Sequence, residues 1–312
     1  MSKKFDLEAF KESLKLTELE EKNPKYVVLN EELQACIGLP GFPLGDIIEI
    51  HGDSDTGKST LLLHAASQCQ KQGILPVLII VEKKYRDHRA SLMGLDQKNA
   101  IINKSCKSIE DIFEFSDKIV AAVNKGKIPQ DVMIFIDSLG NVNSKEARKE
   151  NKDGTTELKN IHQKNAKVIT EHLMVMSDKI GDTRFTTNPH YVGMVVLNQV
   201  YEAPPAFPGG PTRQIPRGGK KLKYTASLQL QTKKVKELIA RINGENVSFG
   251  IISKIIVKKN HINSIKNTGE FVIVEDKIFA NEDGAIEDYK EENRDKWGNA
   301  EIVEFSAETE DS

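Results

Sequence analysis

The stretch IIEIHGDSDTGKST, residues 47–60, decides the fold of this chain. It begins with an apolar run, passes through a loop that fits G-x-x-x-x-G-K-[ST] from Gly52 to Ser59, and continues into a segment with helical spacing. Glycines let such a loop curl so that its backbone N–H groups face phosphate oxygens, and the helix that follows adds its positive end. The stretch therefore predicts a strand, a phosphate-binding loop and a helix, in that order.

The loop offers one cation and one hydroxyl for a nucleotide. Lys58 would reach the β and γ phosphates of ATP, and the Ser59 hydroxyl would bind Mg²⁺, so ATP and Mg²⁺ are the expected cofactors. A glycine-rich turn without a ligand is the alternative. The other residues that we expect to surround the phosphates are Gly52, Asp53, Ser54, Asp55, Thr56, Gly57 and Thr60.

Two carboxylates follow apolar runs elsewhere in the chain. Asp137 ends the run 133–136 and Glu82 follows the run 77–81, which places both at the carboxyl edge of a sheet, where ligands bind in open α/β folds. Asp137 is the candidate that completes the magnesium site with Ser59, and a helix cap is the alternative. Glu82 is the candidate that orients or deprotonates the attacking water, and a solvated surface charge is the alternative.

Runs of Ile, Val and Leu without polar alternation recur along the chain. Strands of this kind are typical of parallel sheets that helices cover on both faces. We therefore expect an α/β fold with a doubly wound, mostly parallel sheet. The runs cover residues 47–50, 76–81, 132–136 and 192–197.

The composition excludes several classes of protein. No apolar run approaches the roughly 18 residues of a membrane helix, and the start MSKKFDLEAF lacks the apolar core of a signal peptide. The isolated cysteines Cys36, Cys69 and Cys106 form none of the close pairs that metal or redox motifs use, so they indicate buried or incidental thiols in a reducing compartment. We expect a cytoplasmic protein without a membrane partner.

The formal net charge of −2 hides an asymmetry. Residues 282–312 hold 12 acidic and 3 basic side chains, which leaves 34 acidic and 41 basic side chains in residues 1–281. This balance indicates a body that meets a polyanion and an acidic tail that repels or competes with it. A solvated tail that only aids solubility is the alternative.

Several segments surround the expected core. Residues 5–22 have the spacing of a short amphipathic helix, and residues 26–29 are β-prone. Asn30 is a plausible cap for a helix that runs to about Ile37. Residues 38–45 indicate a turn. Residues 142–165 contain no apolar run, and residues 201–221 are dense in Pro and Gly. Loops of this length inside a core are usually functional or disordered.

These motifs together resemble the RecA family of recombinases. Leu39–Thr60 resembles the strand and Walker A loop of that family, and Ile80–Asp96 resembles its second strand, with Glu82 at the water-activating position. Asn198 and Gln199 stand at the end of a strand where the family has its phosphate-sensing pair.

The match spans about residues 28–274, and Phe135–Asn141 with the Lys-rich segment that follows is similar to phage recombinases of the UvsX type. One interpretation of this similarity is that the protein is encoded by a phage and acts in the cytoplasm of the bacterial host.

The resemblance implies a domain organisation. It comprises a RecA-like P-loop ATPase core over residues 38–280, an N-terminal arm over residues 1–37 that docks on the next protomer by adding a strand to its sheet, and an acidic tail over residues 281–312. In this family ATP lies between neighbouring protomers of a helical filament on single-stranded DNA. Lys259 and His261 resemble the segment that reaches the neighbour's ATP, so the implied catalytic set is Lys58, Glu82, Gln199 and Lys259.

The resemblance also assigns residues 142–165 and 201–221 to two DNA-binding loops. Cationic side chains neutralise phosphates, glycines let the backbone approach the strand, and an aromatic side chain can wedge against bases. Phe207 could equally anchor its own loop in the core. The candidate DNA-binding residues are Lys145, Arg148, Lys149, Phe207, Gly209, Gly210, Arg213, Arg217, Gly218, Gly219, Lys220 and Lys221.

Three functions remain open from the sequence. The first is an ATP-dependent recombinase that forms filaments on single-stranded DNA and pairs it with duplex DNA, with single-strand-binding and loader proteins as further candidate partners. The second is a hexameric helicase with the same core, and the third is a recombination mediator that barely hydrolyses its nucleotide. The Pro/Gly-rich segment 201–221 favours the recombinase.

Overall fold

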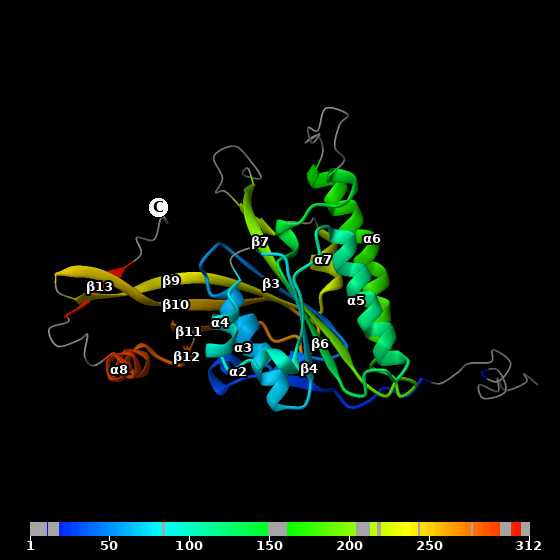
Figure 1. The fold of residues 1–312 in the computed structure, drawn as a ribbon, viewed down its shortest axis with the longest axis horizontal. Coiled ribbons are helices and arrows are strands. Elements are labelled where there is room, and N and C mark those ends of the chain that lie inside the picture. Colours follow the sequence, from blue (N-terminus) through cyan, green and yellow to red (C-terminus); the bar gives the residue numbers. More distant parts are fainter. Residues whose placement is uncertain are drawn as a thin grey trace, which may run out of the picture.

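The strand Ile47–Gly52 (β3) lies in the middle of the sheet, and all of its residues are buried. In the computed structural model it pairs in parallel with β7 (Val192–Ala203) on one side and with β9 (Leu228–Ile242) on the other. Beyond β7 the parallel sheet continues through β6 (Val132–Asp137), β4 (Leu75–Ile80) and β5 (Ile101–Asn103), as Figure 1 shows.

The structure describes residues 11, 19–82, 85–148, 161–203, 213–216, 220–242, 244–275, 277–293 and 301–306. Within these ranges the sheet has 11 strands, in the order β12-β11-β10-β9-β3-β7-β6-β4-β5, with β13 attached to β9 and β8 attached to β7. None of the helices in this part of the chain combines the length and apolar character needed to cross a membrane.

Helices cover both faces of the parallel strands. Ile48 and Ile50 pack into one buried cluster with α3 (Lys58–Lys71), whereas Ile47 packs into another with α5 (Ile109–Asn124) and α6 (Ile161–Asp182). Successive side chains of a strand point to opposite faces, so an unbroken apolar run is what a sheet covered on both faces requires. The expected doubly wound α/β fold is therefore confirmed.

An antiparallel extension leaves the parallel sheet at β9. It consists of β10 (Glu245–Asn260), β11 (Thr268–Val274) and β12 (Lys277–Phe279), and it projects beyond the helices in Figure 1. The helix α8 (Glu282–Glu292) buries Ala285 and Tyr289 against these strands, and β13 (Glu301–Ser306) pairs with β9. Much of the acidic segment expected as a tail is thus packed against the extension.

The segment before β3 also packs into the core. β1 (Tyr26–Val28) pairs with β2 (Gly41–Pro43), which lies inside the expected turn 38–45, and α2 (Glu31–Ile37) buries Leu33 and Ile37. The amide of Gln72 closes the outer edge of β1, because it accepts from the Val28 N–H and donates to the Val28 carbonyl, both at 2.9 Å. Residues 26–37 are thus integrated with the core, and docking of the arm on another protomer stays a prediction.

The remaining elements connect these layers. They are α4 (Asp87–Leu92), η1 (Gln97–Asn99), η2 (Leu139–Asn141), η3 (Glu146–Arg148), β8 (Arg213–Pro216) and α7 (Lys220–Thr225). Cys36 and Cys69 are buried and Cys106 is half-buried, and all three are free thiols.

The packing of α2 on β11 leads to a test of the fold. A Cβ atom at Gly269 would lie 2.5 Å from Cys36 Sγ and 2.7 Å from Cys36 Cα, so Gly269→Ala should force the helix away from the strand. We expect a loss of about 1–3 kcal/mol in the free energy of unfolding, measured with urea.

Gly181→Ala in α6 is the matched control. There the nearest atom to a new Cβ is the end of a flexible side chain, Arg184 Nη2 at 3.7 Å. Alanine favours the helix over glycine, so this variant should be unchanged or gain up to about 1 kcal/mol. Equal behaviour of the two variants would contradict the packing of α2 on β11.

Candidate nucleotide site

The phosphate loop joins β3 to α3 with its backbone in a left-handed conformation at two positions. Asp55 has φ 57° and Gly57 has φ 84°. At Gly57 a Cβ atom would lie 2.4 Å from Ile273 Cδ1, and at Gly52 it would lie 2.4 Å from the Thr232 carbonyl oxygen. Gly52 is therefore required by the close approach of the β9 backbone, and Gly57 is required by the left-handed curl of the loop.

A buried set of hydroxyls clamps the loop to the strands beside it. The Thr56 hydroxyl lies 2.7 Å from that of Thr232 on β9 and donates to the Asp53 carbonyl at 2.9 Å. The Ser253 hydroxyl on β10 donates to the Thr56 carbonyl at 2.9 Å. Thr56, Thr232 and Ser253 are all nearly inaccessible to solvent, so the loop is fixed before any ligand arrives.

The Lys58 ammonium lies at the centre of the loop. It donates to the Gly52 carbonyl at 2.9 Å and also contacts the Asp53 carbonyl. Burial lowers the pKa of Lys58, and the negative charges of Asp137, Asp53 and Glu82 oppose that shift. A half-buried cation that contacts oxygen atoms of the loop and lies near carboxylates is well placed to bind an anionic group.

The two predicted carboxylates lie at the same edge as Lys58. Asp137 ends β6 and is almost fully buried, and the backbone N–H groups of Val81 and Glu82 donate to its carbonyl at 2.9 and 3.2 Å. The Ser59 hydroxyl hydrogen-bonds to the Asp137 carboxyl, whose pKa is raised to about 6 by burial and by the neighbouring Glu82 carboxylate. Asp137 is not a helix cap, because Ser138 precedes η2.

Gln199 and Asn198 lie on opposite sides of β7. The parallel register sets Gln199 beside Gly52, and Gln199 lines the cavity over the loop. Asn198 is buried and donates to Glu49 Oε1 at 2.9 Å, while Gln229 of β9 donates to the other oxygen of the same carboxylate. Burial raises the pKa of Glu49. The sequence does not predict that Glu49 is buried and hydrogen-bonded in this way, because it lies within an otherwise apolar run and belongs to no motif.

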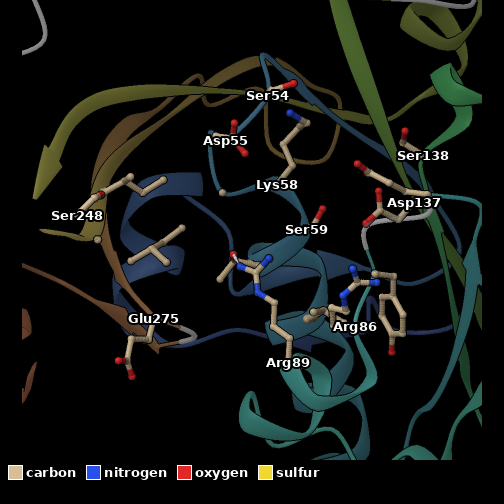
Figure 2. A pocket seen from close by; sticks show the side chains of 18 of the residues that line it. Ser54, Asp55, Lys58, Ser59, Arg86, Arg89, Asp137, Ser138, Ser248 and Glu275 are labelled. Atoms are coloured by element: carbon tan, nitrogen blue, oxygen red, sulfur yellow. Dashed lines mark hydrogen bonds between the residues drawn. The ribbon is translucent and has the colours of Figure 1, made fainter. Parts of the chain in front are cut away.

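The cavity has a volume of about 400 Å³. Figure 2 shows Lys58 and Ser59 between Asp137 and Ser138 on one side and Ser248 and Glu275 on the other. The predicted residues that line it are Ser54, Asp55, Gly57, Lys58, Ser59, Thr60, Glu82, Asp137 and Gln199. The structure thus brings into one space the candidates of the phosphate loop and the start of α3, of the segment after β4, and of β6 and β7.

Besides Leu63 and Ser138, two groups of lining residues are missing from the sequence prediction. Tyr85, Arg86 and Arg89 follow Glu82, and the Arg89 guanidinium donates to the Thr60 hydroxyl at 2.6 Å. Because these two arginines directly follow a strand that ends at the ligand-binding edge, the sequence could have identified them as candidate site residues. The second group is residues 248–251 of β10 with Ile273 and Glu275, which come from the antiparallel extension.

A family model described as the RecA N-terminal domain matches residues 12–279, most of the chain. The chain belongs to the RecA family. The prediction that the chain is a member of this family is thereby confirmed.

Curated relatives agree with this assignment. The chain is 28% identical over 223 residues to Protein RecA of Mesomycoplasma hyopneumoniae (strain 7448), covering 70% of this chain and 60% of the relative. It is 27% identical over 259 residues to Protein RecA of Corynebacterium aurimucosum, covering 83% and 62%. The chain therefore spans about 60% of the length of these relatives. The similarity to UvsX-type phage proteins stays a prediction.

Lys259 and His261 lie away from the nucleotide cavity of their own chain. The Lys259 ammonium donates to the carbonyls of Lys223, Tyr224 and Ala226 at 3.0, 2.8 and 2.6 Å, so it caps the C-terminal end of α7. His261 lines a separate cavity of about 200 Å³. A role toward the nucleotide of the same protomer is therefore unsupported, and a role toward a neighbour's nucleotide stays a prediction.

The expected DNA-binding loops contain regular structure at their ends. η3 and the start of α6 lie within residues 142–165, while the end of β7, the antiparallel strand β8 and the start of α7 lie within residues 201–221. Arg148, Arg213, Lys220 and Lys221 belong to these elements. The candidates outside the described residues are Lys149, Phe207, Gly209, Gly210, Arg217, Gly218 and Gly219.

Lys145 is engaged by acidic side chains of α5. Its ammonium lies 3.1 Å from Asp111 Oδ1 and 3.2 Å from Glu114 Oε1, and these contacts raise the pKa of Lys145. Contact with a DNA phosphate would have to compete with these exposed ion pairs. Such pairs are weak in water, so they do not remove Lys145 from the candidates.

Proposed function

We propose that this RecA-family chain is a DNA-dependent ATPase that forms helical filaments on single-stranded DNA and promotes homologous pairing and strand exchange. The observation that carries the proposal is the convergence of Lys58, Ser59, Glu82, Asp137 and Gln199 on one cavity at the carboxyl edge of the sheet. These residues come from four separate segments of the chain, and together they offer a cation, a metal-binding pair, a base and an amide.

Each side chain has a chemical role in the hydrolysis of ATP. Lys58 and the loop amides would bind the β and γ phosphates, and Ser59 with Asp137 would hold Mg²⁺. When bound, the ion would neutralise charge on the phosphates. Glu82 would accept a proton from the attacking water, because it projects from the end of β4 beside Asp137. Gln199 would contact the γ phosphate.

The position of Gln199 offers a path from the nucleotide to DNA. β7 continues from Gln199 to Ala203 and pairs there with Arg213 of β8, so one strand runs from the cavity to the candidate DNA-binding segment. A change at the γ phosphate would move the base of this β7–β8 ribbon. The cationic residues assigned to the segment 201–221 would neutralise DNA phosphates.

The rate of ATP hydrolysis with and without single-stranded DNA tests the proposed function. We expect the DNA to raise the rate at least roughly tenfold, because filament assembly would complete each site, together with helical filaments in negative-stain images. Closed rings would identify a helicase instead. Negligible hydrolysis at saturating DNA, with the nucleotide bound, would identify a mediator.

Mixing two inactive variants tests the composite site implied by Lys259. Glu82→Gln damages the half of the site that binds ATP, and Lys259→Ala damages the half expected from the neighbour. In a head-to-tail assembly roughly a quarter of the interfaces of an equal mixture would combine an intact Glu82 with an intact Lys259. The DNA-stimulated rate of the mixture should therefore exceed the mean of the two separate variants.

The matched control mixes Glu82→Gln with Lys58→Ala. Both changes lie in the ATP-binding half, so every interface keeps a damaged half and no activity should return. If the first mixture shows no gain while both variants enter the same filaments, Lys259 has no role across the interface and only caps α7.

A further inference from the structure

One wall of the nucleotide cavity comes from the antiparallel extension. Residues 248–251 of β10 and Ile273 of β11 line the cavity. Neighbouring residues of β11 face opposite ways, because Ile273 packs over the phosphate loop while Val272 and Val274 belong to the small core beneath α8. The wall is thus a thin layer with the cavity on one face and α8 on the other.

A β-bulge interrupts this wall at Phe249. Ser248 is paired with Ile239 and Gly250 with Leu238, so β10 has one residue more than β9 at this point. A bulge loosens the ladder locally and re-aims a side chain. Gly250 allows the close approach, since a Cβ atom there would lie 2.5 Å from the Ile273 carbonyl oxygen. The position of Phe249 therefore depends strongly on what its side chain packs against.

The partner of the Phe249 ring is Tyr289 of α8. The two ring centroids are 4.7 Å apart, the planes are inclined by 23°, and both side chains are buried. Phe249 is also among the residues that line the cavity, so one residue of the wall links that space to α8.

Ion pairs connect α8 to the strands beside it. Glu282 in its first turn lies 3.1 Å from Lys236 of β9, and Lys277 lies 2.8 Å from Asp288 and 2.7 Å from Glu292. The acidic residues of this helix thus serve to dock it on the extension, a role that the charge balance of the sequence did not indicate.

We propose that Tyr289 is a positioning residue that holds Phe249 and the bulged wall of the cavity in the shape that accepts the nucleoside part of the nucleotide. The proposal rests on the proposed binding of ATP. The phosphates would lie at Lys58 and Ser59, whereas the wall carries apolar side chains that suit the faces of a base. In Figure 2 Ser248 lies across Lys58 from Asp137, away from the expected metal end.

The test compares the binding of Mg·ATP and of Mg·tripolyphosphate by calorimetry. Tripolyphosphate has the phosphates but lacks the base and the ribose, so it probes the loop alone. Tyr289→Ala should weaken Mg·ATP binding roughly tenfold while its affinity for Mg·tripolyphosphate stays within about twofold of the wild type. Tyr289→Phe keeps the ring and should bind both ligands as the wild type does.

The outcomes separate this inference from the proposed function. A wild-type protein that binds neither ligand would overturn the proposed function and the inference together. A folded Tyr289→Ala variant that binds Mg·ATP within twofold of the wild type, or that loses both ligands equally, would overturn the inference alone. If Tyr289→Ala does not fold, Tyr289→Leu keeps most of the buried volume without the ring and decides by the same two affinities.

Discussion

The anchoring of the phosphate loop is the constraint on which the rest of the structure depends. A phosphate-binding loop has to present its N–H groups to the ligand. In this chain Thr232 and Ser253 hold the loop at Thr56. Those hydroxyls belong to β9 and β10, far along the chain from the loop. The loop is therefore a local motif in the sequence but a product of the whole sheet in the structure, because its shape requires both strands in register.

The sheet also brings the charged groups together without using local sequence. Parallel strands end at one edge, so Glu82, Asp137 and Gln199 meet above Lys58 although they come from different strands. Bringing these groups together out of water has an electrostatic cost: burial and the neighbouring Glu82 carboxylate raise the pKa of Asp137, and burial lowers the pKa of Lys58 although the nearby carboxylates oppose that shift. A ligand that combines negative phosphates with a divalent cation would relieve both shifts, since it brings an anion to Lys58 and a cation to Asp137.

The parts that the sequence predicted well are those that short segments determine. The motif from Gly52 to Ser59 and the apolar runs before Glu82 and Asp137 were sufficient to place the cavity and the parallel strands. The antiparallel wall at Phe249, the docking of α8 and the clamp at Ser253 were not predictable, because they depend on which distant strands pair and on a bulge in their register. Composition did not reveal that residues 282–292 form a helix packed on the extension, where some of the acidic side chains make ion pairs with Lys236 and Lys277.

The functional proposal requires this edge of the sheet to bind Mg·ATP through the phosphate loop. Equilibrium binding of Mg·ATP to the wild type and to Lys58→Met decides whether it does, since methionine keeps an unbranched flexible side chain but removes the charge and the N–H donors of the ammonium. We expect the wild type to bind, and the variant to lose at least roughly a hundredfold in affinity with its fold intact, because the half-buried Lys58 ammonium would contact the phosphates. Equal affinity of the two proteins would contradict the account.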